Sequence, residues 1–129
     1  MGEGLTVEKI KNTVAEFWKQ GVTTFFPTFI TSGHLQLIEN LEIFVEAQKD
    51  SKIASSIPGF HLEGPYISPV DGFRGAHPLE HVRLPNWEEF KQYIEAANNK
   101  IVQVTLAPEV EGQFHLLKNV LKKELLELE

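Results

Sequence analysis

The sequence contains no cysteine, so it can form neither a disulfide nor a thiolate metal site. Any metal ion would have to be held by histidine, aspartate or glutamate side chains. No apolar run approaches the ~20 residues that a membrane-spanning helix needs, and the first residues have neither the basic region nor the apolar core of a signal peptide. From these absences we expect a cytoplasmic protein with no membrane partner.

Positive charge is also scarce. Twelve lysines and arginines face 18 aspartates and glutamates, which gives a formal net charge of −6. This balance predicts no nucleic-acid partner, because a phosphate-binding face needs a basic excess. A small anionic ligand needs only a local cationic pocket. The 129 residues are 42% hydrophobic and 23% charged, which is typical of one globular domain spanning residues 1–129.

Segments of helical and strand periodicity alternate along the chain. Apolar residues at helical spacing predict helices over residues 6–19, 33–49 and 86–98, and a last helix whose core face carries Phe114, Leu117, Val120, Leu121 and Leu125. Thr6 and Asn86 are expected to cap two of them, with Glu89 completing a capping-box pattern. Segments rich in β-branched and aromatic residues predict buried strands over residues 22–30, 59–67 and 101–107. Pro27 is expected to end the first strand or to form a bulge in it.

Strands separated by helices of this length imply right-handed βαβ units and a parallel sheet. Three strands are too few for a closed (β/α)₈ barrel, which takes ~250 residues. No glycine-rich nucleotide-binding turn is present. The predicted fold class is therefore α/β, as a partial (β/α)₈ TIM barrel of about three βα units, so residues 1–129 would be an incomplete catalytic domain.

Side chains able to bind anions or metals are concentrated between residues 61 and 83. This stretch holds three of the five histidines, both arginines and three acidic residues: His61, His77, His81, Arg74, Arg83, Glu63, Asp71 and Glu80. It begins near the end of the second predicted strand and continues into a long loop. In a barrel, strand ends and the loops that follow them form the active site, so we expect the site here.

Glu63 is expected near the end of a buried strand, just before Gly64-Pro65 bends the chain. A carboxylate in that position must be paired, protonated or metal-bound, because an isolated buried charge is very costly. Two interpretations stay open, namely a metal ligand or an ion pair with Arg74 or a nearby histidine. His61 lies two residues earlier and faces the same side of the strand, so the two side chains could form a pair of ligands.

The loop offers several candidate anion-binding groups. Gly75-Ala76-His77 could present backbone N–H groups and an imidazole to an oxyanion, or could form an ordinary turn with an exposed histidine. Arg74 and Arg83 could hold a phosphate through their guanidinium forks, or could be solvated.

Other polar groups are expected to be structural. Glu109 ends the third strand much as Glu63 ends the second, and it is expected to charge the start of the last helix. His34 and His115 are expected on helices, as surface or packing residues.

Four segments together resemble a known family. They are Gly21-Val22-Thr23-Thr24-Phe25-Phe26-Pro27-Thr28, His61-Leu62-Glu63-Gly64-Pro65-Tyr66, Gly75-Ala76-His77-Pro78 and Val104-Thr105-Leu106-Ala107-Pro108-Glu109. In this order and at these separations they resemble an internal fragment of N-acetylglucosamine-6-phosphate deacetylase, from the amidohydrolase superfamily. The segments are spread over most of the chain.

The resemblance implies a barrel enzyme that hydrolyses N-acetylglucosamine 6-phosphate to glucosamine 6-phosphate and acetate. By this resemblance Glu63 corresponds to a ligand of a divalent metal, commonly zinc or iron, and Ala76 with His77 corresponds to the pair that contacts the amino-sugar phosphate. The family's His-x-His pair, its two later histidine ligands and its catalytic aspartate have no counterpart here. We therefore expect no catalytic residue in this chain, which alone would be inactive and metal-free.

Two other functions are also compatible with the sequence. The chain could be a non-catalytic scaffold or a self-associating half-barrel module, because an unclosed parallel sheet has two open edges. We expect a homo-oligomer whether the chain belongs to the enzyme or is such a module. The chain could also belong to a barrel enzyme that acts on phosphosugars without a metal.

Overall fold

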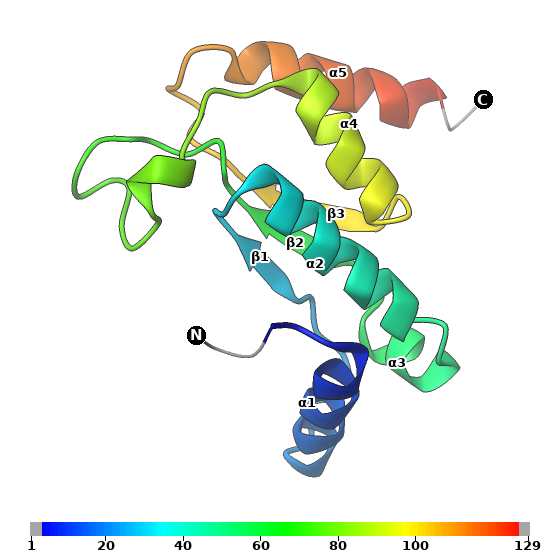
Figure 1. The fold of residues 1–129 in the computed structure, drawn as a ribbon. Coiled ribbons are helices and arrows are strands. Elements are labelled where there is room, and N and C mark those ends of the chain that lie inside the picture. The colour runs from blue at the N-terminus through cyan, green and yellow to red at the C-terminus, as the bar shows by residue number, and fades with distance from the viewer. Residues whose placement is uncertain (1–3, 127–129) are drawn as a thin grey trace.

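The computed structural model describes residues 4–126. In chain order the elements are α1 (Val7–Lys19), β1 (Thr28–Ile30), α2 (His34–Ala47), α3 (Ser51–Ser56), β2 (Phe60–Glu63), the 3₁₀ helix η1 (Leu79–His81), α4 (Trp87–Ala96), β3 (Ile101–Thr105) and α5 (Gln113–Leu126) (Figure 1). No helix in these residues combines the length and the apolar character needed to cross a membrane.

The three strands form one parallel sheet in the order β1-β2-β3. Phe29 of β1 pairs with Leu62 of β2, and Leu62 pairs with Val104 of β3. A register irregularity at Phe60/His61 shifts the pairing between β2 and β3. The predicted α/β class with a parallel sheet is confirmed.

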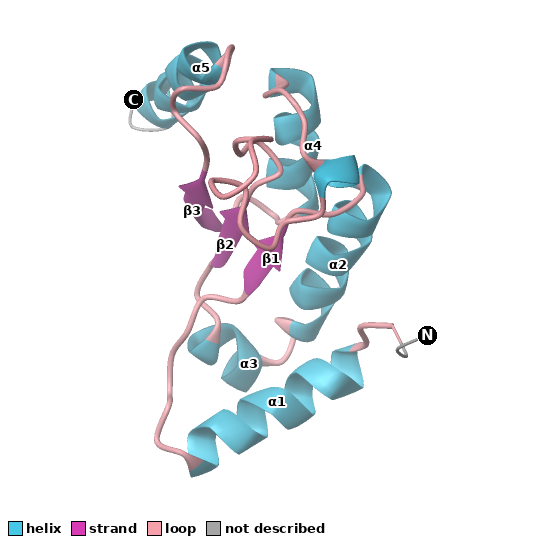
Figure 2. Ribbon diagram, turned by 90° about the vertical axis from the view of Figure 1, so that its left-hand side faces the viewer, coloured by secondary structure: helices cyan, strands magenta, loops and turns pink. Residues whose placement is uncertain are grey.

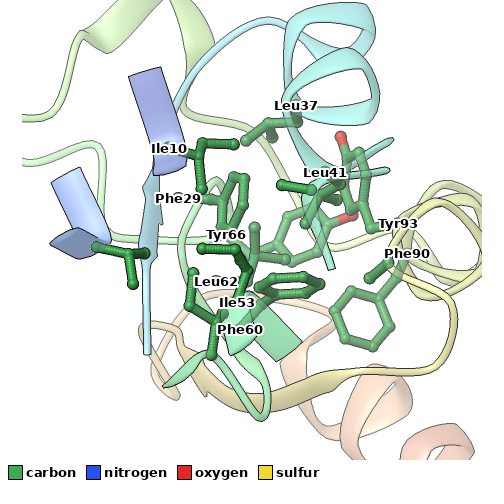
Figure 3. Packing of buried hydrophobic residues seen from close by; sticks show 14 of the residues in the cluster. Ile10, Phe29, Leu37, Leu41, Ile53, Phe60, Leu62, Tyr66, Phe90 and Tyr93 are labelled. Atoms are coloured by element: carbon green, nitrogen blue, oxygen red, sulfur yellow. The ribbon is translucent and has the colours of Figure 1, made fainter. Parts of the chain in front are cut away.

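One face of the sheet is covered by helices and the other is open. Figure 2 shows α2 and α4 against the covered face, where Phe29, Phe60 and Leu62 join a buried cluster with residues of α1, α2 and α4 (Figure 3). Side chains of the opposite face, such as Ile30 and Thr105, are exposed. Both faces of a parallel sheet are usually covered. Because this face is exposed, it can form a binding site or an interface.

Local sequence signals set the helix starts as predicted. The Thr6 hydroxyl accepts a hydrogen bond from the Lys9 N–H, and Asn86 Oδ1 accepts one from the Glu89 N–H. These bonds satisfy N–H groups that the first turn of a helix leaves without a partner. The α1 helix ends at Lys19, just before Gly21, which has a φ of +81°.

The first strand is much shorter than predicted, since only residues 28–30 of the expected 22–30 pair with β2. Upstream of β1 the Phe25 N–H donates to the Ser56 carbonyl at the end of α3. Pro27 precedes the strand instead of ending it, and its carbonyl accepts from the His61 N–H. The prediction was wrong because a strand-like composition does not determine which partner the backbone finds.

Two helix predictions also need correction. The predicted helix 33–49 stops at Ala47, and a separate short helix, α3, follows, capped by the Asp50 side chain. The predicted core face of α5 is largely exposed, with Phe114 at 75% and Leu121 at 58% of full exposure, whereas Leu116 is buried. Leu125 lies outside the side chains that are described.

Candidate functional site

A pocket of about 650 Å³ lies at the carboxyl ends of the strands. The strand ends contribute Ile30, Glu63 and Thr105, and the loop after β2 contributes Arg74 to His77. The carboxyl edge of a parallel sheet is where α/β proteins place their ligands. All three site residues suggested by the resemblance, Glu63, Ala76 and His77, line this pocket.

Glu63 is the last residue of β2, and 35% of its side chain is exposed. Directly after it, Gly64 adopts a φ of +83°, and the Gly64–Pro65 peptide bond is cis. His77 Nε2 lies 4.0 Å from Glu63 Oε1, a contact that becomes an ion pair only when the imidazole is protonated. Arg74, the other expected partner, instead pairs with Asp71.

The side chains of Arg74 and Thr31 hold the Gly75–His77 segment in place. Arg74 Nη1 donates to the His77 carbonyl at 2.8 Å, and His77 Nδ1 lies 3.0 Å from Thr31 Oγ1. Ala76 is exposed in the pocket, and within residues 4–126 its N–H donates no hydrogen bond. The segment therefore offers an unused backbone donor and an imidazole to a ligand.

His61 faces the same side of β2 as Glu63, as predicted, but its ring is already hydrogen-bonded. Its Nδ1 lies 3.0 Å from Thr28 Oγ1 on β1, and its Nε2 lies 2.8 Å from Thr105 Oγ1 on β3. Both nitrogens are thus engaged with the flanking strands, which leaves neither directed at Glu63. His61 joins the three strands across the open face in this structure.

The donor set for a hydrolytic metal is incomplete here. Such a metal takes about three protein ligands and leaves a position for water. Among the residues that the structure describes, no three histidine or acidic side chains are grouped closely enough to hold an ion. Glu63 and His77 are at most two such groups, so residues 4–126 do not by themselves fit the metal that the resemblance implies.

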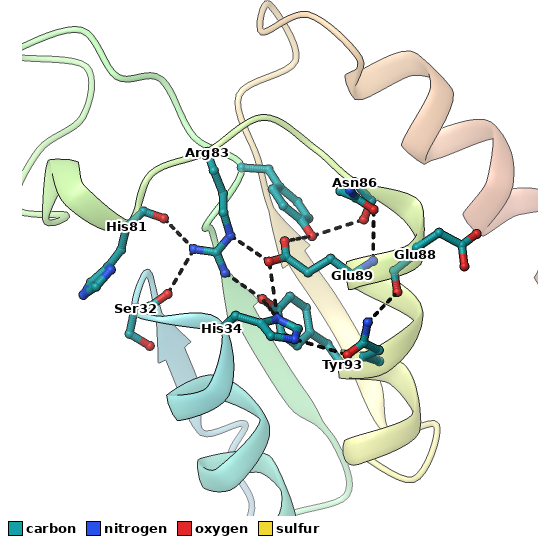
Figure 4. Close-up of polar contacts among 10 residues, drawn as sticks. Ser32, His34, His81, Arg83, Asn86, Glu88, Glu89 and Tyr93 are labelled. Carbon is teal, nitrogen blue, oxygen red and sulfur yellow. Dashed lines mark hydrogen bonds and ion pairs between the residues drawn. The ribbon is translucent and has the colours of Figure 1, made fainter.

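A second polar group, missed by the sequence reasoning, lies between α2, α4 and the end of the long loop (Figure 4). We call it the Glu89 cluster: His34, Tyr66, Arg83, Glu89 and Tyr93. Glu89 accepts hydrogen bonds from Arg83 Nε at 2.8 Å and from the Tyr66 hydroxyl at 2.6 Å. His34 Nδ1 lies 3.3 Å from the same carboxylate and 3.0 Å from the Tyr93 hydroxyl.

Arg83, for which the sequence left phosphate binding and solvation open, is instead bound within the protein. Besides Glu89, its guanidinium donates to the Tyr93 hydroxyl and to the backbone carbonyls of Ser32 and His81. These four acceptors use all three guanidinium nitrogens and fasten the loop to the start of α2. The role of Arg83 is to anchor that loop. The capping-box pattern did identify Glu89, but its side chain turns to Arg83 and Tyr66 rather than to the helix start.

The Glu89 cluster predicts a distinctive alkaline transition. Burial, then the hydrogen bond to Glu89, raises the pKa of Tyr66 far above its ordinary 10.0, and burial, then the charge of Glu89, raises the pKa of Tyr93. The unfolded chain ionises its tyrosines near pH ~10. Because the folded-state pKa values are raised, the resulting stability is fully present below that pH and is lost as the pH rises above it.

The measurement is tyrosinate absorbance against pH, recorded together with helical circular dichroism. The chain has only two tyrosines, and both lie in the cluster. We expect tyrosinate to appear only as the helices unfold. A titration with a midpoint near 10 in the folded protein would contradict the description of the cluster.

No family model matches the chain, but individual proteins do. The N-acetylglucosamine-6-phosphate deacetylase of Bacillus subtilis is 33% identical over 84% of this chain and 28% of its own length. The Caenorhabditis elegans protein of the same name is 38% identical over 71% of the chain and 22% of its own length. This chain therefore spans about a quarter of the relatives' length.

A solved structure shows the same relationship in three dimensions. The N-acetyl-D-glucosamine-6-phosphate deacetylase of Mycobacterium smegmatis superimposes with a TM-score of 0.76 at 26% identity, covering 89% of this chain and 31% of the other. The resemblance suggested by the four sequence segments is thereby confirmed. The chain is related in sequence and fold to the N-acetylglucosamine-6-phosphate deacetylases, of which it matches about a quarter of the length.

Proposed function

We propose that this chain is one section, roughly the second to fourth strand units, of a metal-dependent (β/α)₈-barrel deacetylase. The complete protein would hydrolyse N-acetylglucosamine 6-phosphate to glucosamine 6-phosphate and acetate. One observation supports this most strongly. Glu63, Ala76 and His77 line a single pocket at the carboxyl ends of the parallel strands, although Glu63 is 13 positions or more from the other two in the sequence. A cytoplasmic location and a homo-oligomeric state remain part of the proposal.

In the complete protein, Glu63 would supply one ligand to a divalent metal, zinc or iron, and the other ligands would come from outside this chain. Ala76 and His77 would bind the amino-sugar phosphate. The unused N–H of Ala76 suits an oxyanion. The His77 imidazole would reach another polar group of the sugar. In this proposal, residues 4–126 supply the groups that bind the substrate and one of the metal ligands.

The experiment is a product assay on the complete protein. Incubation with N-acetylglucosamine 6-phosphate should release acetate and glucosamine 6-phosphate in equal amounts. N-acetylglucosamine without the phosphate serves as the control and should react more slowly, because it loses the contacts that hold the phosphate. If neither acetate nor the free amine forms, the proposed reaction is wrong.

The 129-residue chain alone is expected to release no acetate above the buffer background. The reason is physical, since a hydrolytic metal needs about three protein ligands and the described residues do not group three. Acetate release should be measured at matched molar concentrations of the chain and the complete protein. Acetate release by the chain that disappears in Glu63→Ala would show that a functional site is contained within it.

The open sheet face favours a second candidate, a self-associating module. Ile30 on this face is 57% exposed, and β1 and β3 each have an unpaired edge. Exposed edges of this kind pair readily with another chain. Sedimentation of the 129-residue chain tests it: a concentration-dependent dimer supports the module, and a monomer at all concentrations contradicts it.

A further inference from the structure

One carboxylate outside the pocket binds both ends of the long loop that follows β2. It belongs to Glu89, in the first turn of α4, where it faces Arg83 (Figure 4). Its Oε2 accepts a hydrogen bond from the Tyr66 hydroxyl at 2.6 Å, and its Oε1 accepts one from Arg83 Nε at 2.8 Å. Tyr66 lies three residues after the end of β2, and Arg83 lies 17 positions later. Glu89 thus joins the beginning of the loop to its end.

Between these ends the loop has little packing of its own. From residue 69 to residue 80 no side chain is buried. The hydrogen bonds of this part are mostly internal, such as those from the Arg74 N–H to the Val70 carbonyl and from Arg74 Nη1 to the His77 carbonyl. Compact surface loops with adjoining ends are held by their own side chains. The order of this loop therefore depends strongly on what joins its ends.

A carboxylate suits this role, because its two oxygens accept from different donors at the same time. The contact with Arg83 joins opposite charges, and only 16% of the Glu89 side chain and 27% of the Arg83 side chain are exposed. Hydrogen bonds to an ionised group are about twice as strong as those between neutral groups. The backbone of Glu89 is fixed as well, since its N–H donates to the side chain of Asn86 that caps α4.

The loop that is closed in this way forms one wall of the pocket. Tyr66, Arg83 and Glu89 do not line the pocket themselves, but the loop between the first two supplies residues 67–68 and 73–77 to its lining. The carboxylate proposed as a metal ligand belongs instead to the end of β2 and is held by the sheet. Opening of the loop would therefore displace the groups proposed to bind the substrate and leave that carboxylate in place.

We propose that Glu89 is a positioning residue that closes this loop and thereby sets the fraction of molecules in which residues 73–77 are in place to bind a ligand. A ligand that binds only to the closed loop has an apparent affinity reduced in proportion to the closed fraction. The identity of that ligand, an amino-sugar phosphate, rests on the proposed function. The closure of the loop does not, because it follows from contacts within this chain.

The first test is amide hydrogen exchange, measured by NMR on the ¹⁵N-labelled 129-residue chain. Glu89→Leu removes both acceptors and keeps roughly the size of the side chain. The Arg74 and Arg83 amides, which donate to carbonyls of the loop, should then exchange about 10-fold faster or more, as expected for the loss of a hydrogen bond to a charged group. The Phe60 and His61 amides of β2 are the reference and should change much less. Loop amides that keep their rate, or loop and β2 amides that accelerate equally, would refute the positioning role.

Glu88→Leu is the matched control. Glu88 lies in the same turn of α4, is 74% exposed and pairs with Lys91 rather than with the loop, so this variant should leave the exchange of the loop unchanged. Glu89→Gln should give intermediate rates, because an amide can still accept from Arg83 and donate to the Tyr66 hydroxyl but carries no charge.

Tyr66→Phe decides the question if Glu89→Leu does not fold. It removes one hydroxyl and keeps the ring, which is fully buried in the core. The beginning of the loop then loses its bond to Glu89, and the Arg74 amide should exchange faster than in the wild-type chain. An unchanged rate would overturn the proposal.

The second test separates positioning from general damage in the complete protein. Glu89→Leu should raise KM for N-acetylglucosamine 6-phosphate about threefold or more and change kcat by less than about twofold, because the loop is proposed to bind substrate but supplies no metal ligand. The KM for N-acetylglucosamine without the phosphate should rise less, since that substrate makes fewer contacts with the loop. A fall in kcat alone, or equal losses for the two substrates, would contradict a positioning role.

The two proposals fail in different ways. Faster exchange of the loop in Glu89→Leu, with no acetate released by the complete protein, would leave the closure of the loop standing and remove the deacetylase function. Acetate release by the complete protein, with loop exchange unaffected by Glu89→Leu, would do the reverse.

Discussion

Replacing Glu63 with Ala in the complete protein is expected to lower the rate of acetate release by more than about 100-fold. Loss of an outer-shell partner of a metal ligand already costs about 10–100-fold in affinity or activity, and Glu63 is proposed as a direct ligand. Metal content should fall together with activity. The measurement is acetate release at saturating substrate, with the bound metal determined on the same sample.

Glu109→Ala provides the matched control for this prediction. Glu109 is an exposed carboxylate that follows β3 and lines the same pocket, so its removal changes the pocket's charge by the same amount. It is expected to retain most of the activity and all of the metal. If Glu63→Ala kept its metal and its activity, the ligand assignment would be wrong.

Gly64→Ala is expected to have the largest effect on stability, about 2–5 kcal/mol. A left-handed backbone costs a residue with a side chain about 1–2 kcal/mol, and overpacking a well-packed site adds about 1–3 kcal/mol. The overpacking arises because the new methyl would lie 2.1 Å from Thr31 Oγ1. The free energy of unfolding from urea denaturation measures the change.

Gly72→Ala separates the two contributions. Gly72 has a φ of +88°, close to that of Gly64, but no atom lies within 4 Å of the Cβ it would gain. Only the backbone cost of about 1–2 kcal/mol is expected there. Equal losses in the two variants would mean that the contact between Gly64 and Thr31 contributes nothing.

The broad architecture could be predicted from the sequence because its determinants are local. Thr6 and Asn86 start helices through hydrogen bonds that span three residues. Strand-like segments separated by helices predict parallel pairing, and that pairing brings the end of β2 into the same pocket as the loop containing His77. The expected position of Glu63 at a strand end followed from the same pattern.

The contacts that shape the site could not be predicted, because they join residues that are far apart in the sequence. Thr31 and His77 are 46 positions apart, and His34 and Tyr93 are 59 apart. Such pairs leave no periodic signal in a single sequence. A polar residue such as Glu89 also has several possible partners, and only the folded structure shows that it binds Arg83 and Tyr66 rather than its own helix start.

The short first strand and the exposed face of α5 have a related cause. Strand propensity and helical periodicity describe which face of an element is apolar, but not which neighbour covers it. The exposed Phe114 and Leu121 of α5 have no covering element among the described residues. Under the proposed function the remaining barrel units would cover such surfaces, and this agrees with the quarter of the relatives' length that the chain matches.

The central claim is that this chain supplies Glu63 and the His77 loop to a metal-dependent deacetylase. Its most direct test is acetate release from N-acetylglucosamine 6-phosphate by the complete protein, before and after its metal is removed with a chelator. The account predicts that acetate release is lost with the metal and returns when zinc or iron is added back. Acetate release that continues at the same rate in the metal-free protein would contradict it and would favour a phosphosugar enzyme that needs no metal.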